Sequence, residues 1–205
     1  MSSKTLKRLL GSITVVGVAA AMAGLGTFAT FTSSTSASHT ISSGTVSIAL
    51  GTTGPANRLT IGASNVVPGD TIQRAVDLLN NGGASADNLS SIVLNTTASP
   101  SSLLDTEATS GLQMAIEKCS TAWTESGTSP AFTYTCSGTT STVLASRAVI
   151  GSNIALSNLA SLTTGSTDHL RVTLTLPTAA PNTMQGLTST ISYNFVGTQR
   201  VAGSK

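Results

Sequence analysis

The stretch Leu170-Arg171-Val172-Thr173-Leu174-Thr175-Leu176-Pro177 decides the fold class of this chain. Its apolar residues occupy every second position, which is the period of a half-buried β-strand rather than of a helix. Proline has no backbone N–H to donate to a neighbouring strand, so we expect the strand to end at Pro177. The stretch therefore predicts a strand with one face on an apolar core.

Shorter runs with the same period lie before and after this stretch. They are separated by glycine, proline and asparagine turns, of which the clearest is Val66-Val67-Pro68-Gly69-Asp70. Residues 99–110 favour a loop or one short helix, and Leu156, Leu159 and Leu162 have the spacing of successive helical turns. The runs that predict further strands are Val46 to Leu50 (with Val46, Ile48 and Leu50 on one face), Leu59 to Ile61, Thr71 to Leu79, Leu89 to Asn95, Leu112 to Cys119, Phe132 to Cys136, Val143 to Leu144 and Ile191 to Phe195.

These strand-like runs predict an all-β protein with a single antiparallel β-sandwich, since no long helical period competes with them. The sandwich is expected to span residues 44–197 and to be preceded by an N-terminal signal helix. A polar C-terminal tail is expected at 198–205. The sequence shows no internal repeat and no proline-rich linker that would divide the domain in two.

The composition argues against nucleic-acid binding. Only 9% of the residues are charged, and Lys4, Lys7 and Arg8 contribute three of the ten basic residues. The rest of the chain carries seven basic and eight acidic residues without a basic cluster. A surface with so little charge opposes self-association poorly, which suits a protein that assembles.

The N-terminus has the pattern of a secretory signal peptide, which we place at residues 1–30. A basic start is followed by an apolar run at 9–25, small residues follow the run, and no charged residue occurs between Arg8 and Arg58. The run is long enough to leave open a retained membrane anchor, which is the only membrane contact that the sequence suggests. Export would make the protein secreted, or would place it at the cell surface or in an extracellular matrix.

Two segments resemble the start of the TasA/camelysin family of secreted bacterial biofilm-matrix and cell-surface proteins. They are Gly26-Thr27-Phe28-Ala29-Thr30-Phe31 and Ile41-Ser42-Ser43-Gly44-Thr45-Val46-Ser47-Ile48. The resemblance implies a jelly-roll form of the sandwich and signal cleavage between Thr30 and Phe31. Cleavage after Ala29 or near Ala37 stays open, because alanine is the more usual residue before a cut.

The resemblance also implies a function in assembly. Residues 31–43, including Phe31, Thr32, His39 and Ile41, would form a flexible segment that pairs as a strand with an open sheet edge of a neighbouring copy. Such head-to-tail contacts generate a fibre, so we expect a homo-oligomer or fibre with matrix or cell-wall partners. The alternatives are a monomeric surface- or carbohydrate-binding sandwich, and the metallopeptidase that some camelysin relatives are labelled as.

The sequence offers little for catalysis. Its only histidines are His39 and His169, and no zinc-protease, serine-hydrolase or phosphate-loop motif is present. We therefore predict no catalytic residue, no metal, no cofactor and no peptidase activity, with both histidines in solvent. Asp105 and Glu107 share a predicted loop, where we expect a solvated pair with calcium binding as the alternative.

The two cysteines, Cys119 and Cys136, are expected to form a disulfide. An exported chain with one cysteine pair favours a bond, and each cysteine ends an alternating run. Trp123 lies inside the loop that this bond would close, and we expect it to pack over the base of the loop. Two buried free thiols are the alternative.

Overall fold

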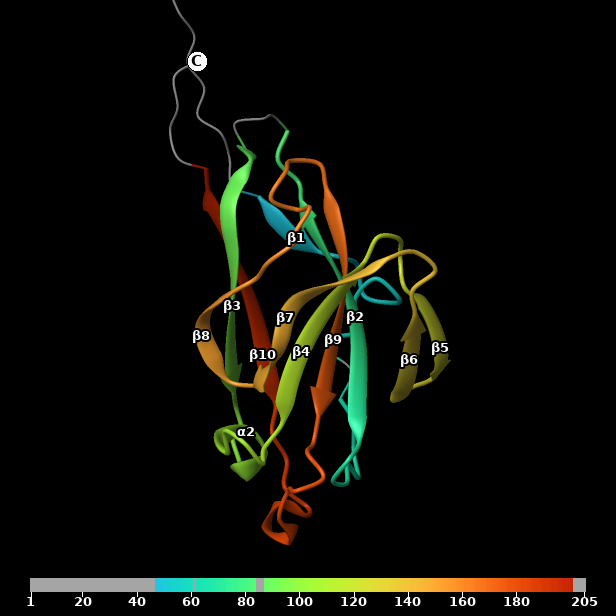
Figure 1. The fold of residues 1–205 in the computed structure, drawn as a ribbon, viewed down its shortest axis with the longest axis vertical. Helices are drawn as coiled ribbons and strands as arrows, with labels where there is room; N and C mark the ends of the chain where they lie inside the picture. Colours follow the sequence, from blue (N-terminus) through green and yellow to red (C-terminus); the bar gives the residue numbers. More distant parts are fainter. Residues whose placement is uncertain (1–46, 61, 84–86, 201–205) are drawn as a thin grey trace, which may run out of the picture. The chain divides into compact units, whose positions relative to one another are not determined.

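Ten strands and two short helical turns form within the residues that the computed structural model describes, which are 47–60, 62–83 and 87–200. All pairings between these strands are antiparallel, and Figure 1 shows their arrangement. The elements are β1 (Ile48–Leu50), β2 (Thr71–Asn80), β3 (Leu89–Ala98), α2 (Leu103–Thr106), β4 (Gln113–Cys119), β5 (Thr124–Thr128), β6 (Ala131–Thr135), β7 (Thr140–Ala148), β8 (Gly151–Ala155), β9 (Thr167–Thr175), the 3-10 turn η2 (Asn182–Met184) and β10 (Ile191–Gln199).

The large sheet has the strand order β1-β2-β9-β4-β7. Its central strand β9 contains the alternating stretch around Leu170, and it pairs with β2 on one side and β4 on the other. Leu170 and Val172 are buried on one face, which we call the inner face, because strand side chains alternate between faces. The outer face carries His169, Arg171 and Thr173.

The small sheet, with the order β10-β3-β8, packs on the inner face of the large sheet. Apolar side chains of both sheets meet in one buried cluster, so the predicted all-β antiparallel sandwich is confirmed. Full burial of each such side chain contributes about 1.5–3 kcal/mol to folding. The core side chains that are at most 1% exposed are Val76, Leu78, Ile92, Leu94, Met114, Ile116, Val143, Val149, Leu170 and Val172.

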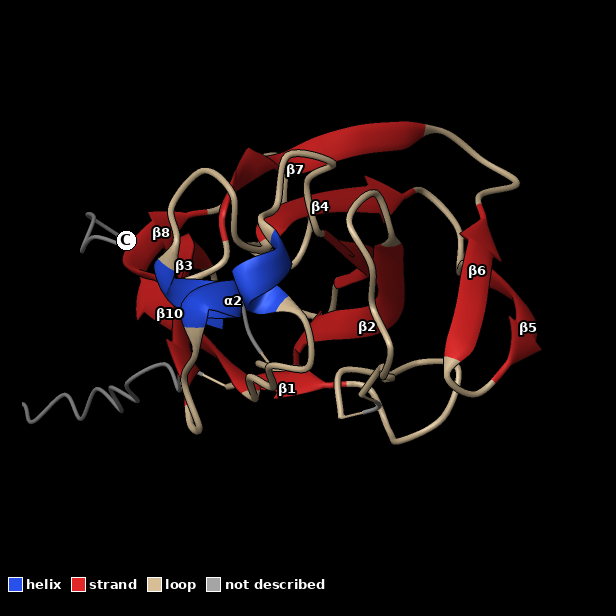
Figure 2. Cartoon of the chain, turned by 90° about the horizontal axis from the view of Figure 1, so that it is seen from below, coloured by secondary structure: helices blue, strands red, loops and turns tan. Residues whose placement is uncertain are grey.

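The β5–β6 hairpin forms a third layer on the outer face of the large sheet. Figure 2 shows this hairpin and the small sheet on opposite sides of the molecule. A second, smaller apolar cluster joins the hairpin to the sheet, with members Ala75, Cys119, Trp123, Phe132 and Tyr134. The large sheet is therefore covered on both faces.

The turn before β2 forms as the sequence predicts. The amide of Asp70 donates to the carbonyl of Val67 at 3.0 Å, and Pro68 and Gly69 occupy the two central positions. Gly69 has a φ of +99°, which glycine adopts without steric cost. Leu59, by contrast, lies in a turn and not in the short strand that we expected around it.

Asp105 corrects the prediction of a solvated acidic loop. It lies in α2, is 5% exposed, and closes a capping box with Ser102. Its carboxylate also accepts hydrogen bonds from the hydroxyls of Ser101 at 2.7 Å and Ser189 at 2.5 Å. Asp105 therefore ties α2 to the segment that leads into β10.

The segment between β8 and β9 is not helical, which corrects the prediction from Leu156, Leu159 and Leu162. These leucines pack against the main core from a chain of bends and turns that closes one end of the sandwich. Apolar residues at every third position can therefore contact a core without forming a helix. β10 also continues to Gln199, two residues past the expected end of the domain, because its backbone still pairs with β3.

Candidate functional site

Charged side chains form a ladder on the outer face of the large sheet. Asp77 of β2 lies opposite His169 of β9, and the His169 Nδ1 is 2.7 Å from the Asp77 carboxylate. One row further, Arg171 of β9 donates to the Glu117 carboxylate of β4. His169, which we expected in solvent, is therefore only partly exposed, and the Asp77 carboxylate holds its ring.

Trp123 anchors the hairpin to this ladder. The centroid of its ring lies 4.4 Å from the guanidinium carbon of Arg171, a cation–π contact. Its indole N–H donates to the carbonyl of His169 at 2.9 Å. Trp123 is 9% exposed and packs in the cluster with both ends of the disulfide, as the sequence predicted.

A second group of contacts fixes the far side of the hairpin. The Arg58 guanidinium donates to both oxygens of Glu125, at 2.8 and 2.6 Å, and the Tyr134 hydroxyl donates to Glu125 at 3.0 Å. The hydrogen bond from Arg58 lowers the pKa of Glu125 below its usual range, against the opposing effect of burial. Phe132 packs beneath the guanidinium of Arg58, whose central carbon lies 4.7 Å from the ring centroid.

The disulfide closes the layer. It joins Cys119 at the end of β4 to Cys136 just after β6, with a Cα–Cα distance of 5.7 Å, and this is the pairing that the sequence predicted. The hairpin is thereby a covalent loop on the sheet that it covers. These contacts make the outer face of the large sheet a structural layer whose charged groups already have partners.

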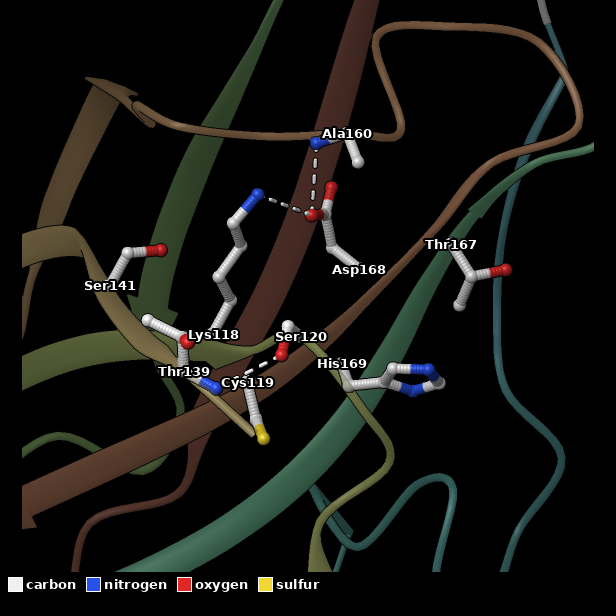
Figure 3. A pocket seen from close by; sticks show the side chains of 9 residues that line it. All are labelled: Lys118, Cys119, Ser120, Thr139, Ser141, Ala160, Thr167, Asp168 and His169. Atoms are coloured by element: carbon white, nitrogen blue, oxygen red, sulfur yellow. Dashed lines mark hydrogen bonds and ion pairs between the residues drawn. The ribbon is translucent and has the colours of Figure 1, made fainter. Parts of the chain in front are cut away.

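A shallow cavity of about 420 Å³ lies at the end of β4 and β9 (Figure 3). The Lys118 amine points to the buried Asp168 carboxylate at 3.3 Å, while the His169 ring points away from both. The Asp168 carboxylate also accepts from the amides of Ala160 at 2.9 Å and Ser161 at 2.8 Å. Serine and threonine hydroxyls complete the lining, from Ser120, Thr139, Ser141 and Thr167.

Within the described residues, the cavity does not contain the catalytic triad of a hydrolase. His169 and Asp77 resemble the base and its orienting carboxylate in a catalytic triad, but no described hydroxyl is hydrogen-bonded to the ring. Ser120 instead accepts from the amide of Thr139 at 2.9 Å. What the arrangement can do is hold a small polar solute against hydroxyl groups.

The described residues also do not fit a zinc or other metal centre. They contain no group of three or more His, Cys, Asp or Glu side chains that could hold a metal ion. Cys119 and Cys136 are joined to each other, and the His169 Nδ1 is engaged by Asp77. His39, the other histidine of the chain, lies outside the described residues.

Strand β10 is an edge of the small sheet in the described part of the chain. Its nine residues pair with β3 on one side, and no other described strand pairs with its free side. The strand has no charged residue, no proline and no irregularity before Thr198. Natural sheets use those features to block edge pairing, so β10 lacks these protections as far as Gly197; beyond it, the Ser90 hydroxyl donates to the carbonyls of Thr198 at 3.2 Å and Gln199 at 3.0 Å.

The opposite edges of the two sheets are less open. β7 has two register irregularities, carries Arg147, and receives hydrogen bonds at its Val143 and Thr142 carbonyls from Ser157 and Asn158. β8 has only five residues and an irregular register with β3. These devices discourage strand addition at that side of the sandwich.

Most of the residues predicted for export and assembly lie outside the described part of the chain. They are Thr30, Phe31, Thr32, His39, Ile41 and Val46, together with the signal helix at 1–30. Ile48 and Leu50 lie in β1, where Ile48 packs against the core and Leu50 is 38% exposed. No helix of the described residues is long and apolar enough to cross a membrane.

Sequence reasoning missed the residues that attach the hairpin. Arg58, Glu125 and Arg171 are isolated charges in the sequence, and they come from a loop and from two different strands. The only available signal was that charged residues are rare in this chain, which singles out each of the three for attention. β10 was found as a strand, but no sequence pattern identified it as a sheet edge.

Comparison with known proteins gives one family. No curated protein matches the sequence significantly. The profile of the camelysin metallo-endopeptidase family matches residues 5–204, which is nearly the whole chain. The match agrees with the resemblance found in residues 26–48. The chain therefore belongs to the camelysin metallo-endopeptidase family.

Proposed function

We propose that this protein is a secreted structural subunit that forms fibres at the cell surface or in an extracellular matrix. In the proposed contact, residues 31–43 of one copy pair as a strand with the free edge of β10 in the next copy. The β10 edge carries this proposal, because no other described strand pairs with its second side, and residues 191–197 of such an edge offer backbone donors and acceptors to a neighbour.

The position of β1 supports the same contact. A Cβ built on Gly197 of β10 would lie only 3.3 Å from a side-chain carbon of Ile48 in β1, so the Ile48 side chain reaches across to the small sheet at this point. The amide of Asn81 donates to the Ser47 carbonyl at 2.9 Å and fixes the point where the chain enters β1. β1 is an edge strand of the large sheet and β10 an edge strand of the small sheet, so a segment that precedes Ser47 starts from the side of the sandwich on which β10 is the edge.

The proposed contact joins copies into a chain. A segment that leaves one copy and pairs with another makes a head-to-tail contact, which does not close on itself. Segment 31–43 has no charged residue and no proline, so neither repulsion nor a missing donor opposes its pairing.

The family name makes a metallo-endopeptidase the second candidate. We propose that this chain acts without peptidase activity, because its described residues do not provide a metal-ligand set. Incubation of the purified protein with casein tests this point. Cleavage that is stopped both by a chelator and by His169→Ala would establish the enzyme instead.

The assembly proposal is tested by the chain that starts at Phe31 and the chain that starts at Ser43. We expect filaments from the first and none from the second, measured by light scattering and negative-stain electron microscopy. A chain from Phe31 that lacks residues 201–205 is the control and should still polymerise. Equal polymerisation of the Phe31 and Ser43 forms, or of neither, would refute strand donation by residues 31–43.

A further inference from the structure

The outer face of the small sheet has a composition unlike that of the rest of the molecule. The strands β3, β8 and β10 contain no Asp, Glu, Lys or Arg at all. Every charged residue of the described strands lies in the large sheet or the hairpin. The side chains on this outer face, which we call the uncharged face, are Ser91, Val93, Asn95, Thr97, Asn153, Ala155, Ser192, Asn194, Val196 and Thr198.

The uncharged face is organised in rows that cross the three strands. Val196, Val93 and Ala155 are register partners and form an apolar row across the middle. Val196 is 40% exposed, which makes it one of the few large apolar side chains that remain accessible. Asn194 and Asn95 form the next row on one side, and Thr198 and Ser91 form the row on the other.

Such a face is chemically complementary to itself. Each hydroxyl and each amide group is both a donor and an acceptor of hydrogen bonds, so it can pair with its own kind. A charged face would repel its own copy. A sugar-binding face usually offers aromatic rings, whereas the described aromatic side chains of this sheet, Tyr193 and Phe195, pack against the core.

We propose that a second copy of this protein stacks its uncharged face on this one. A two-fold axis between the sheets, either along or across the strands, lays the valine row of one copy on the valine row of the other. With the axis along the strands, each flanking row lies on the same row of the other copy. With the axis across the strands, the asparagine row of one copy lies on the Thr198–Ser91 row of the other. Both arrangements join hydroxyl and amide groups. Two sheets in this arrangement lie about 10 Å apart, as in the layers of a sandwich.

The size of the face sets the strength of the contact. Three strands at about 4.8 Å spacing and eight residues at about 3.3 Å give roughly 380 Å² per copy. A standard stable interface buries about 800 Å² per partner, so a single contact is weak. When many copies are held in one assembly, the weak contacts act together. The uncharged faces would then join neighbouring assemblies side by side. The inference does not require segment 31–43.

Residues 42–205 form a compact unit that contains the whole core, so the test uses this unit. A ¹⁵N-labelled sample is measured by two-dimensional NMR while unlabelled protein is added to about 2 mM, the range in which weak contacts are detected. We expect concentration-dependent shifts confined to the amides of residues 91–97, 153–155 and 192–198. These shifts should change little with added salt, because no charges take part.

Ala155→Lys introduces a charge into the apolar row at an exposed position and should weaken the self-association more than about tenfold. Ser91→Lys, on a different strand, should act in the same direction. Thr133→Lys is the matched control, because Thr133 is equally an exposed strand position but lies on the hairpin. It should leave the titration unchanged.

The proposal is overturned if no amide shifts with concentration, or if the shifts fall on other residues. It is also overturned if Thr133→Lys weakens the association as much as Ala155→Lys. A parallel titration with a soluble neutral glucan tests whether carbohydrate, rather than a second copy of the protein, binds the uncharged face. Shifts on the uncharged face with the glucan and none with the protein would assign the face to carbohydrate. Because residues 31–41 are missing from every sample, failure of strand donation cannot produce any of these results.

Discussion

The two sheets of this sandwich have outer faces of opposite character. The large sheet carries an acid–base ladder that a disulfide-linked hairpin covers. Arg171 of the sheet, Glu125 of the hairpin and Trp123 between them all have specific partners. The strands of the small sheet carry no charge, and no described strand or helix covers their outer face or pairs with the second side of β10. Charged groups with fixed partners stabilise one fold. On the small sheet the Asn95 side chain accepts from the backbone amide of Asn153 at 2.7 Å, and the exposed hydroxyl and amide groups around it are accessible to another molecule. We therefore assign stability to the first face and association to the second.

Among the substitutions that test this difference between the two faces, Trp123→Ala is expected to lower the free energy of unfolding most. The substitution removes a buried aromatic side chain, its cation–π contact with Arg171 and its hydrogen bond to His169. We expect a loss of about 3–5 kcal/mol in the free energy of unfolding, measured by urea denaturation. Val196→Ala on the bare face is the control and should cost much less. Similar losses for both variants would abolish the distinction between the faces.

The double substitution Cys119→Ser/Cys136→Ser should rank second. The bond closes a loop with a sequence separation of 17, and such a loop is worth about 3 kcal/mol in the chain-entropy model. Hydrogen exchange should show faster exchange in β5 and β6 and little change in β3 and β10. An equal increase in both regions would mean that the hairpin is not an independent layer.

Acid should act on the hairpin before it acts on the small sheet. Because hydrogen bonding to Arg58 lowers the pKa of Glu125, its contribution is complete above the unfolded-state value, about 4.3. The contribution is lost as the pH falls through the lowered folded-state pKa. Glu125→Gln should therefore flatten the acid limb of the stability curve, which is measured by urea denaturation from pH 6 down to about pH 3. A wild-type curve that is already flat there would contradict this.

The smallest effect is expected from a charge on the bare face. Ser192→Lys lies at an exposed position of β10, so we expect a change within about 0.5 kcal/mol in the free energy of unfolding. Thermal or urea denaturation measures it. A loss above about 1 kcal/mol would show that the uncharged face supports the fold of its own copy, contrary to our assignment.

The fold class could be predicted from the sequence because burial on one face imposes a visible period. The stretch around Leu170 and the run at Met114 both became central strands of the large sheet. β5 and β8 were missed because each has at most one apolar side chain directed at a core, as Ile154 is in β8. Their pairing depends on backbone hydrogen bonds, which leave no period in the sequence.

The contacts of the polar residues could be predicted much less well. His169 and Asp105 were expected in solvent, yet each is held by a residue distant in the sequence, Asp77 and Ser189 respectively. Sequence separation hides such pairs, since strand register decides which side chains meet. The cysteine pair was an exception because the chain has only two cysteines, which leaves a single possible pairing within it.

The close approach of β1 to Gly197 has a practical consequence for protein engineering. The first and last strands of the described domain are edge strands, and the Ile48 side chain of the first lies against Gly197 of the last, so a partner protein fused to either end would be attached on the same side of the sandwich. A bulky fusion after Gln199 is therefore expected to obstruct β10 as effectively as one placed before Ser47. Reporter tags for cell-surface display are better inserted at the β5–β6 turn, where Ser129 and Pro130 are exposed on the far side of the large sheet.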